Sequence, residues 1–153
     1  MPANLAISLV IVGSLGLTPI FAAQVNQVST GAPMKTTVCE ISRNSDTFDG
    51  KLVQVRALIE TGVQDLPSGV ADDSCAAELK FYTPDDAHFA LLLKSKGYRK
   101  LVKDAKKNPV VQATVTGIYK RFTTDDKPEN RLALETVENV TVIPQPHVHG
   151  QKR

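Results

Sequence analysis

A stretch of strictly alternating apolar and polar residues, at positions 49–62, is the clearest pattern along this chain. Its apolar members recur at every second position and are Val53, Val55, Ala57 and Ile59. A period of two is typical of a strand that buries one face and leaves the other in water. The pair Asp49-Gly50 is a turn signal just before this strand. We therefore predict a long strand here, around which the other elements pack.

Three further stretches alternate in the same way, at residues 75–82, 110–119 and 131–143. They predict three more strands. Gly117 lies inside one of them and predicts a bulge or sharp bend. In the last stretch the phase of the apolar positions shifts, which predicts another bulge near Thr136. The polar residues 123–130 are expected to form the hairpin loop between the last two strands.

Helical signals stand between these strands. Thr37 and Glu40 have the spacing of a capping box, which predicts a short helix of about two turns. Thr83, followed by a proline and two acids, predicts the start of a longer helix with the threonine as N-cap. Gly97 is expected to split this segment into two helices, the second over residues 98–107.

The order of these elements indicates a mainly β fold with helices (α+β). A helix before the last two strands is the arrangement of the OB-fold, a small five-stranded Greek-key barrel. We therefore predict a small OB-like, partly open antiparallel barrel. Four strands are clear from the pattern. The fifth either lies within residues 64–74 or arises from one long strand that bends across two positions.

The N-terminal segment predicts export. The first 34 residues carry no charged side chain, and residues 5–20 are an apolar run followed by Phe21-Ala22-Ala23, where a signal peptidase could cut. The alternative is an N-terminal anchor helix, but the run is shorter than the roughly 20 residues that span a bilayer. We expect a protein that is periplasmic or extracellular, and not integral to the membrane after cleavage. The predicted divisions are a signal peptide (1–23), a flexible leader (24–35), an OB-like domain (36–144) and a disordered tail (145–153).

The chain has two cysteines, Cys39 and Cys75. In an oxidising compartment they most simply form one disulfide, which would close a loop of about 37 residues and stabilise the fold by roughly 3–4 kcal/mol. A reactive thiol pair requires spacing of the Cys-x-x-Cys type, which is absent from the sequence. We predict a structural disulfide.

The charge pattern is informative in one helix only. The net charge of +2 and the absence of tryptophan do not favour a specific nucleic-acid partner. The second half of the long helical segment is basic, however, with Lys96, Arg99, Lys100, Lys103, Lys106 and Lys107. One interpretation is a contact surface for anionic lipid or acidic polysaccharide. The other is a solvated helix face with cations near its C-terminus, where the helix dipole favours them.

The residues of common catalytic and metal sites are sparse. The sequence lacks a Walker loop, a Gly-x-Gly-x-x-Gly fingerprint, a His-Glu-x-x-His pair and a Gly-x-Ser-x-Gly elbow. His147 and His149 could together bind a divalent metal weakly, but a complete site needs three or four ligands. His88 falls in the first turn of a helix and is expected to be exposed. We therefore expect neither an enzyme, nor a cofactor, nor a defined metal site.

Three segments resemble known proteins. TVCEISRNSDTFDGKLVQVRALIETG, at residues 37–62, is similar to the cysteine, helix and Val-x-Val-Arg segment of small exported bacterial proteins with OB-like domains. VTGIYKRF and RLALETVENVTVI, at residues 115–122 and 131–143, are similar to their closing hairpin. The resemblance implies an OB-like fold and export. These motifs are structural, so the resemblance supplies no catalytic residues.

OB barrels usually bind ligands on one open face and with the loop between the last two strands. The candidate surface here comprises Arg56, Tyr119, Arg121 and Phe122. An arginine beside aromatic rings can stack on or clamp a partner. The predicted function is an exported, non-enzymatic binding module for a protein, glycan or small ligand. The alternatives are an envelope-associated structural or stress protein that contacts anionic lipid or polysaccharide through the basic helix, and a weak metal-binding protein.

Overall fold

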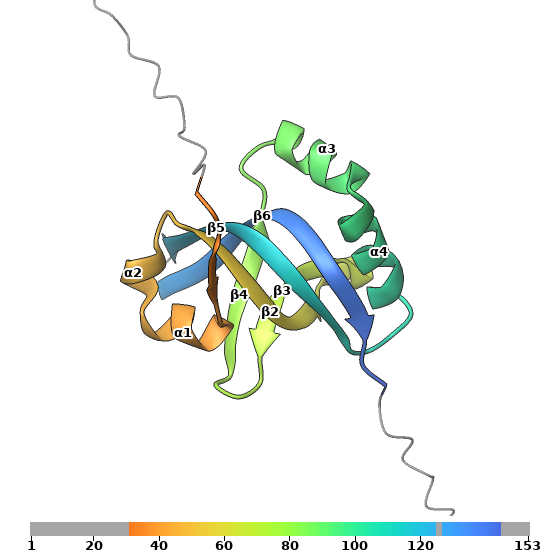
Figure 1. Cartoon of the computed structure of the whole chain (residues 1–153), viewed down its shortest axis with the longest axis horizontal. Helices are drawn as coiled ribbons and strands as arrows, with labels where there is room; N and C mark the ends of the chain where they lie inside the picture. The colour runs from red at the N-terminus through yellow and green to blue at the C-terminus, as the bar shows by residue number, and fades with distance from the viewer. Residues whose placement is uncertain (1–30, 125–126, 145–153) are drawn as a thin grey trace, which may run out of the picture.

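The computed structural model describes residues 31–124 and 127–144 (Figure 1). The strands in these ranges are β1 (Met34–Thr36), β2 (Leu52–Thr61), β3 (Pro67–Asp72), β4 (Ala77–Tyr82), β5 (Val111–Thr124) and β6 (Lys127–Val142). The helices are α1 (Val38–Arg43), α2 (Ser45–Phe48), α3 (Asp86–Lys94) and α4 (Lys96–Ala105), with a 3-10 turn, η1 (Val63–Asp65). The predicted mainly β class, with helices before the last two strands, is confirmed.

The strands form one sheet whose hydrogen bonds run in a ring. The order is β1-β2-β3-β4-β6-β5, and β5 also pairs with β2. The prediction of antiparallel pairing throughout is wrong for two pairs, because β1 lies parallel to β2 and β4 lies parallel to β6. The parallel β4–β6 pair follows from the chain path: α3 and α4 carry the chain away from the end of β4 before β5 and β6 form their hairpin (Figure 1). The sheet is therefore mixed.

The core confirms β2 as the organising strand. Its apolar residues face inward, as the period of two predicts, and they are Val53, Val55, Ala57 and Ile59. β2 is long enough to pair with β5 along Leu52–Leu58 and with β3 from Leu58 onward. Opposite it, Leu79 of β4 and Leu132 of β6 are completely buried. Val38 and Ile41 of α1 and Leu101 of α4 add helical side chains to the same core.

The bulges predicted at Gly117 and near Thr136 are a single irregularity between β5 and β6. The pairing register shifts between Thr116 and Gly117, so that Glu135 of β6 is the extra residue beside Thr136. A methyl group at Gly117 would lie 2.3 Å from the carbonyl oxygen of Ala133, so the close approach of the two backbones requires glycine here. A second shift, which the sequence did not predict, lies between Gln112 and Thr114.

The predicted hairpin loop at residues 123–130 is too long. β5 and β6 stay paired as far as Thr124 and Lys127, so the polar residues of this segment extend the two strands beyond the core. The polar side chains alone predicted a loop. The antiparallel ladder, however, pairs the backbone N–H and C=O groups whatever the side chains are. The missing fifth strand is β3, within residues 64–74, which was one of the two alternatives.

Local helix signals are mostly confirmed, with shifts at the ends. Thr37 caps α1 by accepting a hydrogen bond from the Glu40 amide at 3.0 Å. Asp85, and not Thr83, caps α3, because its extended backbone lets the carboxylate accept from the His88 amide at 2.7 Å. The break between α3 and α4 falls at Ser95, two residues before the glycine that predicted it.

The predicted signal peptide, most of the leader and the tail lie outside the described residues. β1 begins at Met34, so the last positions assigned to the leader pair with β2. No helix in residues 31–124 and 127–144 is both long and apolar enough to cross a membrane.

Candidate functional site

An aromatic–cation cluster occupies the outer face where β4, β5 and β6 meet. We define it as Lys80, Tyr82, Phe122, Glu129 and Arg131. The rings of Tyr82 and Phe122 meet edge to face with their centroids 5.2 Å apart. The guanidinium carbon of Arg131 lies 4.8 Å from the centroid of the Phe122 ring. Such an aromatic and cationic surface is a common recognition element.

Strand pairing explains why these residues converge. β4 and β6 align Lys80 with Arg131 and Tyr82 with Ala133, while β5 and β6 align Phe122 with Glu129. Alternate residues of a strand share a face, so the outward positions of three strands come together. Phe122 is the member that the sequence indicated. The alternating pattern placed Tyr82 on a polar face, but the parallel pairing that brings Arg131 beside it is not visible in the sequence.

Glu129 holds the cluster together electrostatically. Its carboxylate accepts hydrogen bonds from Nε and Nη2 of Arg131 at 2.9 and 2.6 Å, and it lies 3.9 Å from the Lys80 ammonium. The hydrogen bond from Arg131 lowers the pKa of Glu129, and the charges of Arg131 and Lys80 lower it further. Two cations therefore share one carboxylate beside two aromatic rings, and the carboxylates of Asp49 and Glu135 also act on Tyr82.

The surroundings of Tyr82 in this cluster alter its ionisation. Burial raises the pKa of Tyr82, and the nearby carboxylate of Asp49 raises it further. The phenol consequently stays neutral at physiological pH and can donate or accept a hydrogen bond.

The four residues predicted as a ligand surface do not lie together. Tyr119 is wrong as a surface residue: it is completely buried, and its hydroxyl donates to Oδ1 of Asn130 at 2.6 Å. Its position on β5 has the same parity as Val115 and Gly117, so it belongs to the inward face. Burial raises the pKa of Tyr119.

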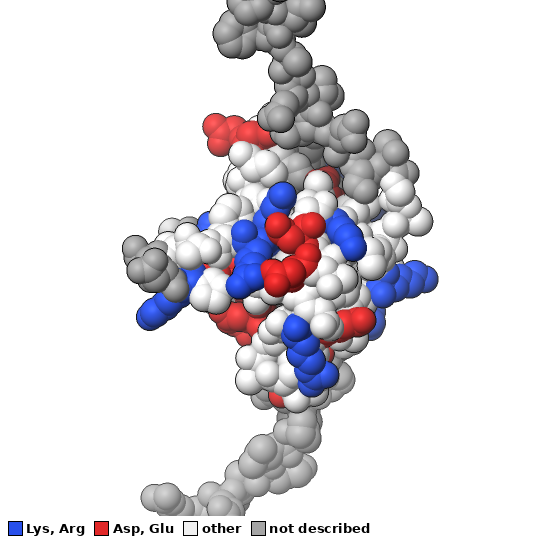
Figure 2. Space-filling model, turned by 90° about the vertical axis from the view of Figure 1, so that its left-hand side faces the viewer, with Lys and Arg blue, Asp and Glu red and all other residues white. Residues whose placement is uncertain are grey.

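Arg121 points to another part of the molecule. Its guanidinium forms an ion pair with Asp46 of α2, and its backbone amide donates to Oδ1 of Asp49 at 3.1 Å. Figure 2 shows the face on the α1 and α2 side, where acidic and basic side chains are intermingled. Arg121 thus fastens α2 to β5 and is separate from Phe122, which projects from the opposite side of the strand.

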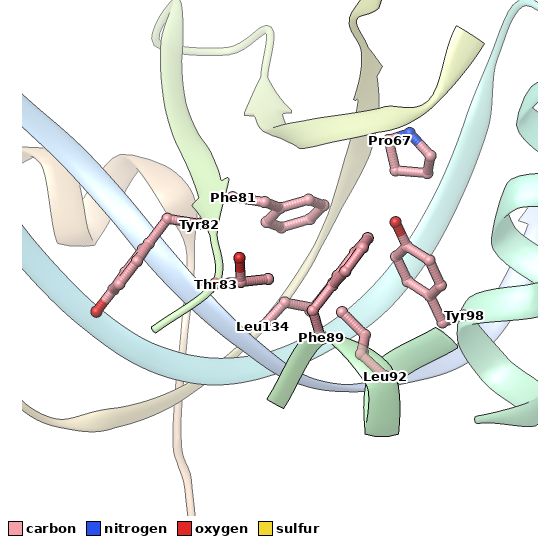
Figure 3. A pocket seen from close by; sticks show the side chains of 8 residues that line it. All are labelled: Pro67, Phe81, Tyr82, Thr83, Phe89, Leu92, Tyr98 and Leu134. Carbon is pink, nitrogen blue, oxygen red and sulfur yellow. The ribbon is translucent and has the colours of Figure 1, made fainter. Parts of the chain in front are cut away.

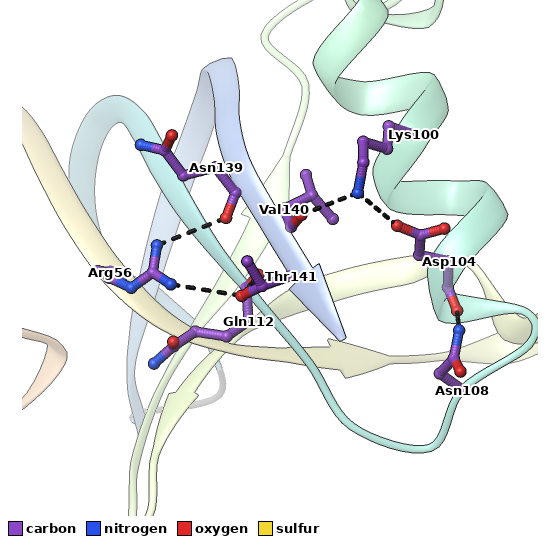
Figure 4. Close-up of polar contacts among 8 residues, drawn as sticks. All are labelled: Arg56, Lys100, Asp104, Asn108, Gln112, Asn139, Val140 and Thr141. Carbon is purple, nitrogen blue, oxygen red and sulfur yellow. Dashed lines mark hydrogen bonds and ion pairs between the residues drawn. The ribbon is translucent and has the colours of Figure 1, made fainter. Parts of the chain in front are cut away.

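Arg56 is held on the outer surface of the sheet by β6 (Figure 4). Its guanidinium donates to the carbonyl of Asn139 at 3.4 Å and to the hydroxyl of Thr141 at 3.3 Å. β2 places Arg56 opposite Thr114, which is eight positions before Phe122 on β5. Arg56 therefore lies far along the sheet from the aromatic–cation cluster.

The basic helix is partly structural. The ammonium of Lys100 donates to Asp104 at 2.7 Å and to the carbonyl of Val140 at 2.8 Å, which joins α4 to β6 (Figure 4). Its other basic positions are exposed: Lys96, Arg99, Lys103, Lys106 and Lys107. None of these five forms an ion pair with a residue in the described ranges. Lys106 and Lys107 follow the last residue of α4.

The predicted disulfide between Cys39 and Cys75 is confirmed, with the two Cα atoms 5.9 Å apart. It joins α1 to the turn between β3 and β4, so Cys75 lies in that turn and not in the predicted strand. Asp72 lies beside the two sulfurs. Its pKa is lowered by hydrogen bonds from the Ser74 hydroxyl and amide. Because the sulfurs are bonded to each other, they offer no thiolate ligands for a metal.

The histidines separate into two cases. His88 was expected to be exposed, but it is half-buried, and its Nε2 lies 2.8 Å from the carbonyl oxygen of Leu134, so it joins α3 to β6. His147 and His149 lie outside the described residues.

Comparison with known protein families finds none that matches this chain, and a search of curated proteins finds no relative.

Proposed function

We propose that this chain is an exported, non-enzymatic binding module with an OB-like, partly open barrel, and that it captures its ligand at the aromatic–cation cluster. The observation that carries the proposal is the packing of Arg131 over Phe122 beside Tyr82, three half-buried side chains on one outer face. A surface of this kind combines a large contact area with directional hydrogen bonding, which protein binding sites favour.

The strand order supports the OB-like interpretation. Five strands form the ring β2-β3-β4-β6-β5, and the helices lie between β4 and β5, before the last two strands. OB-folds bind ligands on the face of their second and third strands and with the loop between the last two. In this ring those strands are β3 and β4, and β4 contributes Lys80 and Tyr82 to the cluster.

The chemistry of the cluster favours a ligand that offers a ring face and an anionic group. A sugar ring can lie against Phe122, and a carboxylate can form charge-assisted hydrogen bonds with Arg131 and Lys80. An acidic glycan carries both features, and we propose this class of ligand ahead of a protein or small-molecule partner.

The disulfide supports the proposed location. Disulfides persist in oxidising compartments such as the periplasm and the extracellular space. The Cys39–Cys75 bond and the predicted signal peptide therefore favour export to one of these compartments.

The test is a titration of the oxidised protein with an oligogalacturonate, followed by amide NMR, with the neutral oligogalactoside as the matched ligand. We expect shifts at β4 and the β5–β6 hairpin with the acidic sugar. F122A and R131A should each weaken binding at least fivefold, whereas R56A should leave it unchanged. Equal binding by F122A and the unchanged protein would exclude the cluster as the site.

A second candidate function rests on α4, where Lys96, Arg99 and Lys103 are exposed and form no ion pair within the described part of the chain. In this proposal the protein is envelope-associated, and Lys96, Arg99 and Lys103 contact anionic lipid or polysaccharide. A K96Q/R99Q/K103Q variant should lose sedimentation with phosphatidylglycerol vesicles in low salt. Undiminished sedimentation of this variant would contradict the proposal.

A further inference from the structure

A half-open cavity of about 170 Å³, walled mainly by apolar side chains, lies between β4, the start of β3 and the two helices α3 and α4 (Figure 3). Its walls include Phe81, Phe89, Leu92 and Leu134. It is separate from the face that carries Phe122 and Arg131, although Tyr82 borders both. This cavity is not part of the site proposed above.

Among the described residues that line this cavity, Tyr98 of α4 is the one deeply buried residue with a polar group on its side chain. Only 6% of Tyr98 is exposed, and Figure 3 shows its ring facing Phe89 with the hydroxyl directed toward the side of Pro67. Within residues 31–124 and 127–144 the hydroxyl forms no hydrogen bond, whereas the Tyr119 hydroxyl does. No fully buried side-chain oxygen in the described residues lacks a partner, so the Tyr98 oxygen keeps contact with solvent. It can therefore exchange water for a hydrogen-bonding partner in the cavity.

The wall formed by α3 is incompletely covered. Of the residues of α3, all within the described ranges, only Leu92 is buried. Phe89, which lines the cavity, is 40% exposed. A molecule in the cavity would cover the Phe89 ring and remove apolar surface from water, which favours binding.

We infer that this cavity binds a small molecule with a single aromatic ring that carries one polar substituent, and that this substituent forms a hydrogen bond with the Tyr98 hydroxyl. The size agrees, because an apolar protein cavity of about 150 Å³ binds benzene. The lining agrees as well, because the rings of Phe81, Phe89 and Tyr98 offer edge-to-face contacts to the ring of the ligand. Burial raises the pKa of Tyr98, so its hydroxyl stays protonated and can donate as well as accept.

The probes for this site are p-cresol and toluene, which differ by one hydroxyl group. Amide NMR of the oxidised full chain should show shifts at Phe81, Thr83 and Phe89 with millimolar p-cresol. Y98F, which keeps the ring and loses the hydroxyl, should weaken p-cresol binding roughly fivefold to tenfold and leave toluene binding unchanged. T83W places a large side chain at the exposed rim and should block both probes.

Two results would overturn the inference: no shift at these residues with 10 mM p-cresol (about the weakest binding of interest), or equal p-cresol affinity of Y98F and the unchanged protein. F122A serves as the control for the other site and should bind p-cresol normally. Loss of glycan binding in F122A with normal p-cresol binding would show that the two sites are independent. The glycan titration and the p-cresol titration therefore test the two proposals separately, and one can fail without the other.

Discussion

The ammonium of Lys100 lies 2.8 Å from the carbonyl oxygen of Val140, and this contact fixes α4 against β6. His88 of α3 makes a corresponding contact with the carbonyl of Leu134. Between them, the backbone of Gly97 approaches the carbonyl of Val137. Three carbonyls of β6, three positions apart, are thus covered by the helices. Covering backbone groups of a strand in this way limits unwanted pairing with other chains.

The contact of Lys100 gives the first prediction. K100A should lower the free energy of unfolding by about 1 kcal/mol, because it removes a charge-assisted hydrogen bond to β6 and an exposed ion pair with Asp104. K103A, which removes an exposed cation of the same helix, should change it by less than about 0.5 kcal/mol. Urea unfolding followed by circular dichroism measures both. Equal values for the two variants would show that the contact with Val140 contributes nothing.

Gly97 gives the second prediction. In an exposed helix, replacing glycine by alanine stabilises by roughly 1 kcal/mol. Here the sign should be reversed, because a Cβ at this position would lie 1.7 Å from the carbonyl oxygen of Val137. We expect G97A to destabilise the fold by about 1–3 kcal/mol, since the helix must move away from β6. G31A, which has no atom within 4 Å of its Cβ, is the control and should be nearly neutral.

These two positions show what the sequence could and could not predict. A glycine and a lysine in a helical segment predicted a break and a solvated cation. The partners of both residues lie about 40 positions further on, in β6. Local patterns report period, caps and breaks, and so the alternating strands and the bulge at Gly117 were predictable. Which strand or helix lies opposite a residue depends on long-range pairing, which a single sequence does not display.

The candidate site illustrates the same limit. Phe122 was predicted as an exposed aromatic beside arginine, but the arginine that it contacts is Arg131 on the paired strand, not its neighbour Arg121. Neighbours on a strand point to opposite faces, so adjacency in sequence separates them in space. Tyr119 could have been placed in the core from its parity with Val115. The outward assignment overlooked the alternation.

The disulfide gives the third prediction. A C39S/C75S variant should unfold at lower urea, with a loss of roughly 3–4 kcal/mol expected for a loop of about this length in the chain-entropy model. The oxidised protein in the presence of dithiothreitol should show the same loss once the bond is reduced. The unchanged protein without reductant is the reference. A loss below about 1 kcal/mol would mean that the reduced unfolded chain keeps α1 near the β3–β4 turn.

The pKa of Glu129 gives the fourth prediction. The hydrogen bond from Arg131 lowers this pKa in the folded protein. The ion pair therefore stabilises the fold fully above the ordinary glutamate pKa, and this contribution is lost as the pH falls through the lowered folded value. A carbon-detected NMR titration of Glu129 should show the pKa rise toward its ordinary value in R131Q.

K80Q provides the graded comparison, because the charge of Lys80 is the weakest of the causes that lower this pKa. Its effect on the Glu129 titration should have the same direction as that of R131Q and be smaller. A larger effect of K80Q would reverse the assigned order of the two cations.

The parallel pair of β4 and β6 also has a consequence for the order of events during synthesis. Lys80–Tyr82 cannot join Arg131–Ala133 until about fifty further residues have been added, so the ring closes only after β6 has been made. Cys39 and Cys75 are both available well before that, with 36 positions between them. Contacts between distant segments form slowly because the intervening chain must first be ordered. Closing the crosslink between α1 and the β3–β4 turn thus requires far less of the chain than closing the sheet, which needs β6 as well.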